Sequence, residues 1–256
     1  MYADLAAPLL EVIACTVEDA IAAEQGGADR LEIVSHLELG GLTPALALVK
    51  AMQAAVRLPL RVMVREEEDF FASGQKKLER LCEVARSYAD LSVDGLVLGF
   101  LTQQDSEIGI AHEMLEVVLA AAPQTRCTFH RAFEAVTNPR MAIAELKRYP
   151  QIDYLLTSHG IRPAAYKGDW PPPWACRIDG RIEGLAELAV VAAPEIKVLV
   201  GGGVTAEWIE SLCREPQIRQ TLSAIHVGQA ARAGHSLHGA VQASQVQKLR
   251  QRMASP

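Results

Sequence analysis

The chain of 256 residues lacks several features that mark common classes of protein. No two of its five cysteines form a Cys-x-x-Cys pair, which argues against a disulfide framework and a zinc knuckle. No apolar run approaches the roughly 20 residues of a transmembrane helix, and the stretch Met1–Pro8 has no basic residue, unlike a signal peptide. The only asparagine, Asn138, precedes Pro139 and lies in no glycosylation sequon. These absences predict a cytoplasmic protein without a membrane partner.

Basic residues are outnumbered by acidic ones, which gives a formal net charge of −6 and a pI near 5.7. A nucleic-acid partner is therefore not expected, because such proteins usually carry a basic patch. Half of the residues are hydrophobic, which suffices for a large core. The length suits one large domain, and a barrel of alternating strands and helices needs about 250 residues.

Short apolar runs alternate with longer amphipathic stretches along the chain. The strand candidates are Leu9–Thr16, Arg30–Ser35, Leu58–Arg65, Gly95–Leu101, Cys127–Phe133, Asp153–Ser158, Lys197–Gly202 and Ala224–Gly228. The helix candidates are Val17–Gly26, Pro44–Val56, Gln75–Ala89, Glu107–Ala121, Asn138–Tyr149, Gly184–Ala193, Thr205–Glu215 and Gly239–Met253. Such alternation predicts parallel strands covered by helices, and eight units favour a closed (β/α)8 TIM-type barrel. The alternative, an open doubly wound sheet, usually has a G-x-G-x-x-G turn after its first strand, which is missing here.

One segment interrupts this rhythm within the single domain predicted for residues 1–256. The irregular excursion at about 160–182 follows the sixth strand and contains Trp170-Pro171-Pro172-Pro173-Trp174, which fits neither a helix nor a central strand. In a barrel it lies over the face formed by the carboxyl ends of the strands. A lid, a subunit contact and a plain surface excursion are all consistent with it.

Charged or titratable side chains lie inside or at the end of four predicted strands, where an unpartnered charge is costly to bury. Glu11 and Glu32 are flanked by apolar residues, Arg65 ends the third strand, and His130 and Arg131 lie together in the fifth. We predict that His130 is a general acid/base near neutral pH, with Glu11 or Glu32 as partner or second base. Arg65 and Arg131 are predicted to bind an anion through their guanidinium forks. Structural ion pairs between these carboxylates and arginines are the alternative.

Neighbouring residues on a strand point to opposite faces, so both members of the His130-Arg131 pair can line one site only if the strand ends there. At the other strand ends, the loops after strands seven and eight of a barrel commonly bind a substrate phosphate through backbone N–H groups. A glycine triplet suits such an approach but also fits any tight turn, and Thr205 after it is a candidate N-cap. The further substrate-binding candidates are Ser158, Gly201, Gly202, Gly203 and His226.

Other patterns predict structure rather than chemistry. The acidic run Glu66-Glu67-Glu68-Asp69 is typical of a solvated loop, since adjacent acids seldom converge on one cation. After Gly40-Gly41, Thr43-Pro44 predicts an N-cap followed by the first residue of a helix. No lysine ends a predicted strand, which argues against a Schiff-base aldolase.

These residues, in this order, resemble the CutC family of copper homeostasis proteins. The matching segments are Leu10–Val12, Gly26–Glu32, Leu39–Pro44, Val62–Arg65, Thr128–Phe133, Leu155–Ser158 and Gly201–Val204. The resemblance implies a cytoplasmic (β/α)8 barrel, often a homo-oligomer, with Glu11, Glu32, Arg65, His130, Arg131, Ser158 and His226 at motif positions. The chain departs from the family pattern at Ile13 and Val34, where cysteines are common, at His36, and in the Glu66–Asp69 loop.

Two functions follow from this resemblance and from the residues. The first is an enzyme of unassigned activity on a small anionic metabolite that bears a phosphate or a carboxylate. The second is a non-catalytic copper-binding or copper-handling protein, as the family name implies. Copper is the only cofactor implied, and it is implied by the name alone: Cu(I) prefers thiolates and thioethers, and no clustered motif of either is present. The metal ligands, if any, are unknown from the sequence.

Overall fold

Eight parallel strands close into a barrel in the computed structural model, which describes residues 8–71, 74–158, 182–215, 218 and 221–254. Around the barrel the strand order is β1-β10-β9-β8-β7-β4-β3-β2. The strands are β1 (Leu9–Ala14), β2 (Arg30–Ile33), β3 (Leu60–Met63), β4 (Gly95–Leu98), β7 (Arg126–Phe129), β8 (Ile152–Thr157), β9 (Lys197–Val200) and β10 (Ala224–Val227). The predicted (β/α)8 barrel is confirmed.

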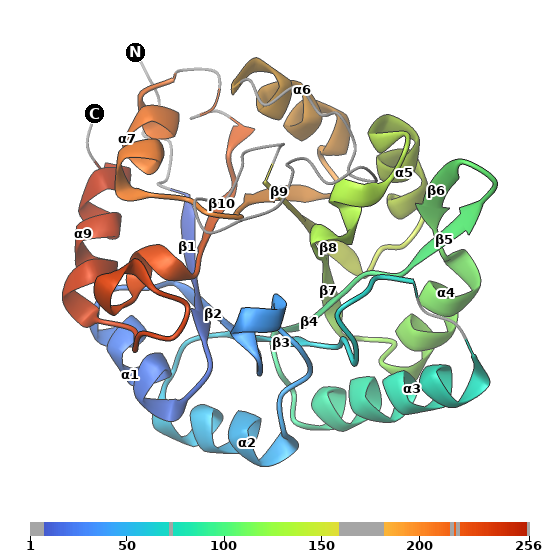
Figure 1. The fold of residues 1–256 in the computed structure, drawn as a ribbon, viewed down its shortest axis with the longest axis horizontal. Coiled ribbons are helices and arrows are strands. Elements are labelled where there is room, and N and C mark those ends of the chain that lie inside the picture. The colour runs from blue at the N-terminus through green and yellow to red at the C-terminus, as the bar shows by residue number, and fades with distance from the viewer. Residues whose placement is uncertain (1–7, 72–73, 159–181, 216–217, 219–220, 255–256) are drawn as a thin grey trace.

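Helices form a ring outside the strands (Figure 1). They are α1 (Val17–Gln25), α2 (Leu46–Ala55), α3 (Gln75–Asp90), α4 (His112–Ala121), α5 (Pro139–Leu146), α6 (Ile182–Ala192), α7 (Ala206–Arg214) and α9 (Ala243–Ala254). Thr205 caps α7, since its side chain accepts a hydrogen bond from the N–H of Trp208, as predicted. Within the described ranges, no helix is long and apolar enough to cross a bilayer. His159 and nearly all of the predicted excursion lie outside the described residues.

Three predicted boundaries were wrong. The helix predicted from Glu107 begins at His112, because Glu107–Ile110 forms strand β6 in an antiparallel hairpin with β5 (Leu101–Gln104). The fifth predicted strand ends at Phe129, and a 3-10 helix, η2 (Arg131–Ala135), follows. The last helix begins at Ala243 rather than at Gly239. The error in the fifth strand arises because Ala132 and Phe133 are apolar and buried, so their pattern does not distinguish a strand from the 3-10 helix that they form.

The prediction that Thr43 caps a helix was also wrong. Helix α2 begins at Leu46, and the Thr43 hydroxyl instead bonds to the backbone of Arg65. It donates to the Arg65 carbonyl and accepts from the Arg65 N–H, both at 2.9 Å. Thr43 thus ties the loop after β2 to the end of β3, next to the opening of the barrel.

The inside of the barrel is unusually polar. On the inward face of β1, Leu9 packs in one small apolar cluster with Tyr154, and Ile13 packs in another with Met63. Glu11 lies two residues from each, so it is on the same face between the two clusters. It is fully buried, and the β1–β10 register sets it beside His226. Barrel closure therefore creates a charged layer inside an apolar frame.

Candidate functional site

A pocket of about 370 Å³ opens at the carboxyl ends of the barrel strands, on the face where barrel enzymes place their chemistry. Its volume lies within the range of small-molecule sites. The predicted site residues that line it are Glu32, Arg65, His130, Arg131, Gly202, Gly203 and His226. Glu11, Ser158 and Gly201 are not part of its lining. The predicted residues therefore fall into a group that faces the pocket and a smaller group behind its wall.

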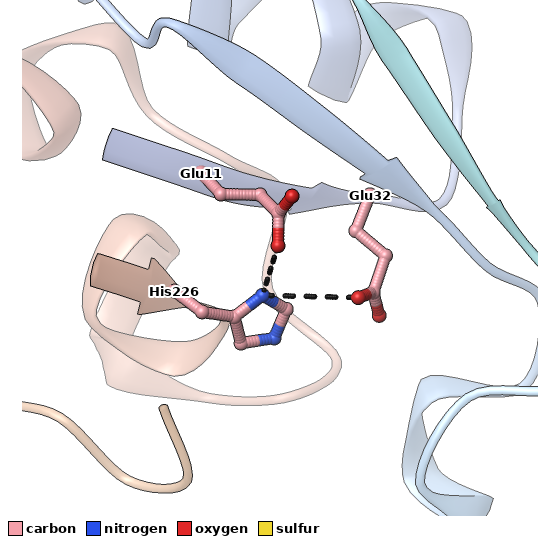
Figure 2. Close-up of side chains that lie close together, drawn as sticks. All are labelled: Glu11, Glu32 and His226. Carbon is pink, nitrogen blue, oxygen red and sulfur yellow. Dashed lines mark hydrogen bonds and ion pairs between the residues drawn. The ribbon is translucent and has the colours of Figure 1, made fainter. Parts of the chain in front are cut away.

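The deepest charged contacts form between three residues from three adjacent strands (Figure 2). His226 Nδ1 donates to Glu11 Oε1 at 2.8 Å, and the same nitrogen lies 3.8 Å from Glu32 Oε2. All three side chains are buried. Glu32 Oε2 has no hydrogen-bond partner among the described residues. The histidine therefore bridges one carboxylate that is fully engaged and one that has unmet bonding capacity.

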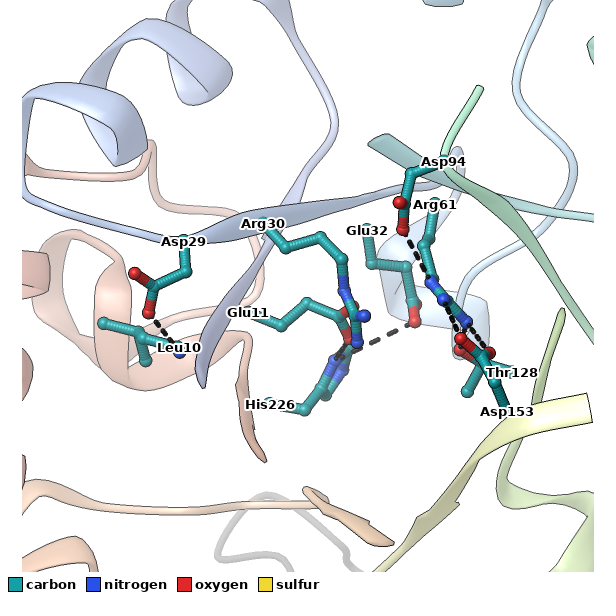
Figure 3. A network of polar contacts seen from close by, with 10 residues as sticks. All are labelled: Leu10, Glu11, Asp29, Arg30, Glu32, Arg61, Asp94, Thr128, Asp153 and His226. Carbon is teal, nitrogen blue, oxygen red and sulfur yellow. Dashed lines mark hydrogen bonds and ion pairs between the residues drawn. The ribbon is translucent and has the colours of Figure 1, made fainter. Parts of the chain in front are cut away.

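Arg30, which sequence reasoning missed, fixes the other side of Glu11. Its Nε donates to Glu11 Oε2 at 2.5 Å, and its guanidinium stacks on the Tyr154 ring at 4.3 Å. Figure 3 shows the contact between Arg30 and Glu11 beside a second buried arginine, Arg61. Arg61 binds both oxygens of Asp153 at 2.6 and 2.7 Å. Arg61 lies in a strand between apolar neighbours, the same signal that singled out the two glutamates, whereas Arg30 follows Asp29.

This arrangement separates the pKa values of the two glutamates. Burial raises the pKa of Glu11, but Arg30 and His226 outweigh burial and bring it down to about 2. Burial also raises the pKa of Glu32, to about 7, because only His226 and more distant arginines oppose it there. For His226, burial is outweighed by the attraction of Glu32 and Glu11, so its pKa is raised. Glu32 thus titrates near neutral pH, whereas Glu11 stays ionised.

His130 does not titrate near neutral pH, contrary to our expectation. Burial, with the positive charge of Arg65, lowers the pKa of His130 to about 3. Its Nδ1 accepts from the N–H of Ala132 at 3.2 Å, so that nitrogen is already occupied, and no carboxylate bonds to the ring. The predicted partnership with Glu11 or Glu32 is likewise not formed, because Glu11 binds Arg30 and His226.

His130 and Arg131 both face the pocket, because their strand ends just before them. Because β7 ends at Phe129, His130 is the N-cap of η2, and both His130 and Arg131 line the pocket.

The two predicted arginines differ in their contacts. Arg65 Nη1 donates to the carbonyls of Gly40 and Gly41 at 3.2 and 3.1 Å, and Nη2 donates to the carbonyl of Glu68. Arg131, in contrast, has no hydrogen-bond or ion-pair partner within the described ranges.

Ser158 is held by a carboxylate that the sequence did not single out. Its N–H donates to Glu134 Oε1 at 2.8 Å and its hydroxyl donates to Glu134 Oε2 at 3.0 Å. Glu134 is buried at the end of η2, directly after the His130-Arg131 motif. The hydroxyl of Ser158 is therefore engaged in fixing the end of β8 against η2.

The glycine triplet provides both room and bonding capacity. A Cβ at Gly201 would lie 2.8 Å from the ring of His226, and one at Gly202 would lie 2.7 Å from Ser158 Cβ. Gly202 and Gly203 have φ of +92° and +89°, a conformation that favours glycine. Neither N–H donates to a backbone carbonyl of the described chain. Those two N–H groups remain available to a ligand.

Three of the four acidic residues after Arg65 lie in ion pairs. Lys77 of α3 lies 2.8 Å from Glu67 and 3.8 Å from Asp69, and Arg80 lies 3.7 Å from Glu66. The loop is thereby tied to the first turns of the helix that follows it. Phe70, which follows the acidic run, packs with its ring centre 5.2 Å from that of His130.

Fold and site together define a closed (β/α)8 barrel with a buried Glu–His–Glu cluster under an arginine-lined pocket. The chain belongs to the CutC family, whose model matches residues 8–227. A CutC family protein of Treponema denticola is 33% identical over 196 residues, covering 77% of this chain and 72% of its own. The human protein named copper homeostasis protein cutC homolog is 32% identical over 197 residues, covering 77% and 66%. The crystal structure of the putative copper homeostasis protein CutC from Streptococcus agalactiae matches with a TM-score of 0.70 and 26% identity, covering 86% of this chain and 98% of that one.

The residues present do not fit a Cu(I) site. Glu11, Glu32 and His226 place one ligand atom each within 4.8 Å of one another. Both oxygens of Glu11 are already bonded, however, to Arg30 and to a protonated nitrogen of His226. Cu(I) prefers thiolates and thioethers, and the described pocket lining offers the thioether of Met63 and no thiolate. We therefore derive no chemistry through copper.

Proposed function

We propose that this CutC family member is an acid–base enzyme that acts on a small metabolite carrying a phosphate or a carboxylate. The observation that carries the proposal is a concentration of unmet hydrogen-bonding capacity at one pocket. Glu32 Oε2, Arg65 Nε and His130 Nε2 are buried without a hydrogen-bond partner in the described part of the chain, and all three side chains line it. Native proteins rarely leave such groups unmet, so they favour a polar ligand.

Charge favours an anionic ligand. Arg131 presents a guanidinium without a partner among the residues that the structure describes, and Arg65 adds a second positive charge close to it. A Cβ at Gly40 would lie 3.3 Å from Arg65 Nη1 and 3.8 Å from Arg131 Nη2. The open N–H groups of Gly202 and Gly203 follow β9, the seventh barrel strand, where phosphate is commonly bound in this fold. A guanidinium fork can bind either a phosphate or a carboxylate through two hydrogen bonds.

Proton transfer is assigned to Glu32, with His226 as its partner. A general base works best when its pKa is near the operating pH, and the pKa of Glu32 is about 7. Glu11 cannot take this role, because Arg30 and His226 keep it ionised far below neutral pH. Its role is to hold His226 in place.

The anion site is tested by the response of thermal stability to a library of anionic metabolites. A ligand at 100 times its Kd adds about 2.7 kcal/mol of stability. We expect at least one phosphorylated or carboxylated compound to raise the Tm of the wild type, and Arg131→Ala to lose most of that shift. Arg148→Ala, at an exposed position, is the matched control and should respond like the wild type. Equal responses of Arg131→Ala and the wild type would remove Arg131 from the site.

The alternative, a copper-handling role like the one named for the human relative, makes a different prediction. Because the described lining of the pocket offers no thiolate, we expect protein purified without added metal to hold much less than one copper per chain. Elemental analysis of the purified chain measures this directly. Near-stoichiometric copper that is lost in His130→Ala or His226→Ala would contradict the enzyme proposal and support copper handling.

A further inference from the structure

The imidazole of His130 is held in one tautomer. Its Nδ1 accepts from the N–H of Ala132 at 3.2 Å, so Nδ1 carries no hydrogen and Nε2 carries it. The ring fits against Gly99 at the end of β4, where a Cβ would lie 2.5 Å from Nδ1 and 2.6 Å from Cε1. The backbone N–H of His130 donates to the carbonyl of Leu98 at 2.8 Å. The orientation of the ring is therefore fixed from β4 and from η2.

The surroundings of this ring keep it uncharged. Phe70 and Phe129 lie with their ring centres 5.2 and 6.2 Å away, and the charged groups that act on it are the cations Arg65 and Arg131. Burial, together with the positive charges of Arg65 and Arg131, lowers the pKa of His130 to about 3. At neutral pH the ring is therefore a neutral hydrogen-bond donor. The donor atom, Nε2, is buried and has no partner among the described residues.

A neutral donor and a base near neutral pH, lining one pocket, form a recognised pair for enolisation. Resting on the proposed function, we propose that the substrate carries a ketone or aldehyde next to a C–H group, in addition to its anionic group. His130 Nε2–H donates to the carbonyl oxygen, and the Glu32 carboxylate removes the proton from the adjacent carbon. Both side chains line the pocket, from β2 on one side and from the end of β7 on the other.

The step balances without any co-reactant. The C–H bond breaks and its proton goes to Glu32, while its electron pair forms the C=C bond of the enolate. The carbonyl π pair moves to oxygen, which the Nε2–H of His130 and the cation of Arg131 stabilise. The proton on Glu32 then exchanges with solvent, and a solvent-derived proton returns to the same carbon, which gives hydrogen exchange. If the adjacent carbon also carries a hydroxyl, the proton of that hydroxyl passes to the former carbonyl oxygen while Glu32 protonates the former carbonyl carbon, which gives an isomer. No lysine lines the described part of the pocket, so a Schiff base does not compete as electron sink there.

Two substitutions separate catalysis from structure at this position. Asparagine places an oxygen where Nδ1 lies and keeps the bond from Ala132, but it lacks a donor at the position of Nε2. Glutamine places an amide N–H near Nε2 but loses the bond from Ala132. If His130 donates to a substrate oxygen, His130→Asn slows the reaction about 10²–10³-fold, the usual effect of removing one such donor, and His130→Gln slows it less. A purely structural role predicts the reverse order.

The experiment incubates wild type, His130→Asn, His130→Gln and Glu32→Gln in D₂O with dihydroxyacetone phosphate, ribulose 5-phosphate and 2-oxoglutarate. Loss of the ¹H signal beside each carbonyl is followed by NMR, and binding of each compound is measured by thermal shift. We expect exchange of at least one compound by the wild type and none by Glu32→Gln. In ¹⁵N spectra of the free protein, His130 should stay neutral and protonated at Nε2 from about pH 8 to about pH 5.

Each outcome decides the matter. Binding without exchange overturns the enolisation inference and leaves the anion site standing, whereas absence of binding by all three compounds counts against the proposed function itself. Exchange that survives in Glu32→Gln removes Glu32 as the base. A rate in His130→Asn equal to that of the wild type, or protonation of His130 near pH 6.5, overturns its role as the neutral donor.

Discussion

Replacing Glu11 by glutamine is expected to destabilise the protein by about 3–5 kcal/mol at neutral pH, the usual result of breaking a buried ion pair from one side. The carboxylate accepts from Arg30 through one oxygen and from His226 through the other, and it is fully buried. An amide has only one acceptor atom, so in either orientation its NH₂ group meets one of the two donors. The charge of Arg30 is also left without a neutralising partner in the interior.

Urea denaturation at pH 7 measures this effect, with Glu113→Gln on the exposed face of α4 as the control. The control should change stability by less than about 0.5 kcal/mol. Adding Arg30→Met to Glu11→Gln should restore part of the loss, because the unpaired charge is removed while an unbranched stem still packs on Tyr154. Strictly additive losses in the double variant would show that the two side chains are not coupled, which contradicts the ion pair.

The barrel could be predicted because its strands are short apolar runs separated by amphipathic helices, and all eight runs become strands. The β5–β6 hairpin was missed for the opposite reason. Residues 102–104 are polar and exposed, and Gly109 interrupts the second strand, so neither piece has the apolar pattern of a barrel strand. The hairpin extends outside the barrel sheet, where hydrophobic burial does not dictate the sequence.

The floor of the pocket was partly predictable. A charge between apolar residues in a strand has to be explained, and this signal found Glu11 and Glu32. The same signal is present at Arg61. Arg30, the cation that pairs with Glu11, follows Asp29 at the start of its strand and gives no such signal. What the sequence cannot show is the register between the first and last strands of the barrel, which sets His226 beside Glu11 across 215 positions of the chain.

The protonation states could not be read from the sequence at all. Residue type alone makes His130 a group that titrates near neutral pH and Glu32 an ordinary acid. In the structure the pKa of His130 is lowered to about 3, because the ring is buried beside cations. The pKa of Glu32 is raised to about 7, because the carboxyl group is buried with too little positive charge around it. Burial and the sign of the nearest charge, which depend on residues distant in sequence, decide which group can exchange a proton.

Replacing Glu32 by glutamine is expected to make the protein more stable at alkaline pH, by about 3 kcal/mol near pH 8. The pKa of Glu32 is about 7 in the folded chain against an ordinary value of 4.5, so the folded state binds this proton more tightly than the unfolded state. The wild type therefore loses stability as pH rises from about 4.5 through 7. His226 also makes the wild type less stable as the pH rises, because its pKa is raised in the folded chain. Glu32 is the largest cause of that rise.

The difference in unfolding free energy between Glu32→Gln and the wild type should therefore grow from about pH 4.5 to about pH 7 and level off above it. Glu11 does not disturb this window, since its pKa of about 2 confines its loss of stability to pH values below about 4.5. Glu38→Gln, exposed at the rim of the same pocket, is the matched control and should follow the wild type. Parallel pH profiles for Glu32→Gln and the wild type would mean that Glu32 is ionised throughout this range, which contradicts its raised pKa. The stability profile thus tests, without any substrate, the property that makes Glu32 suitable for acid–base chemistry.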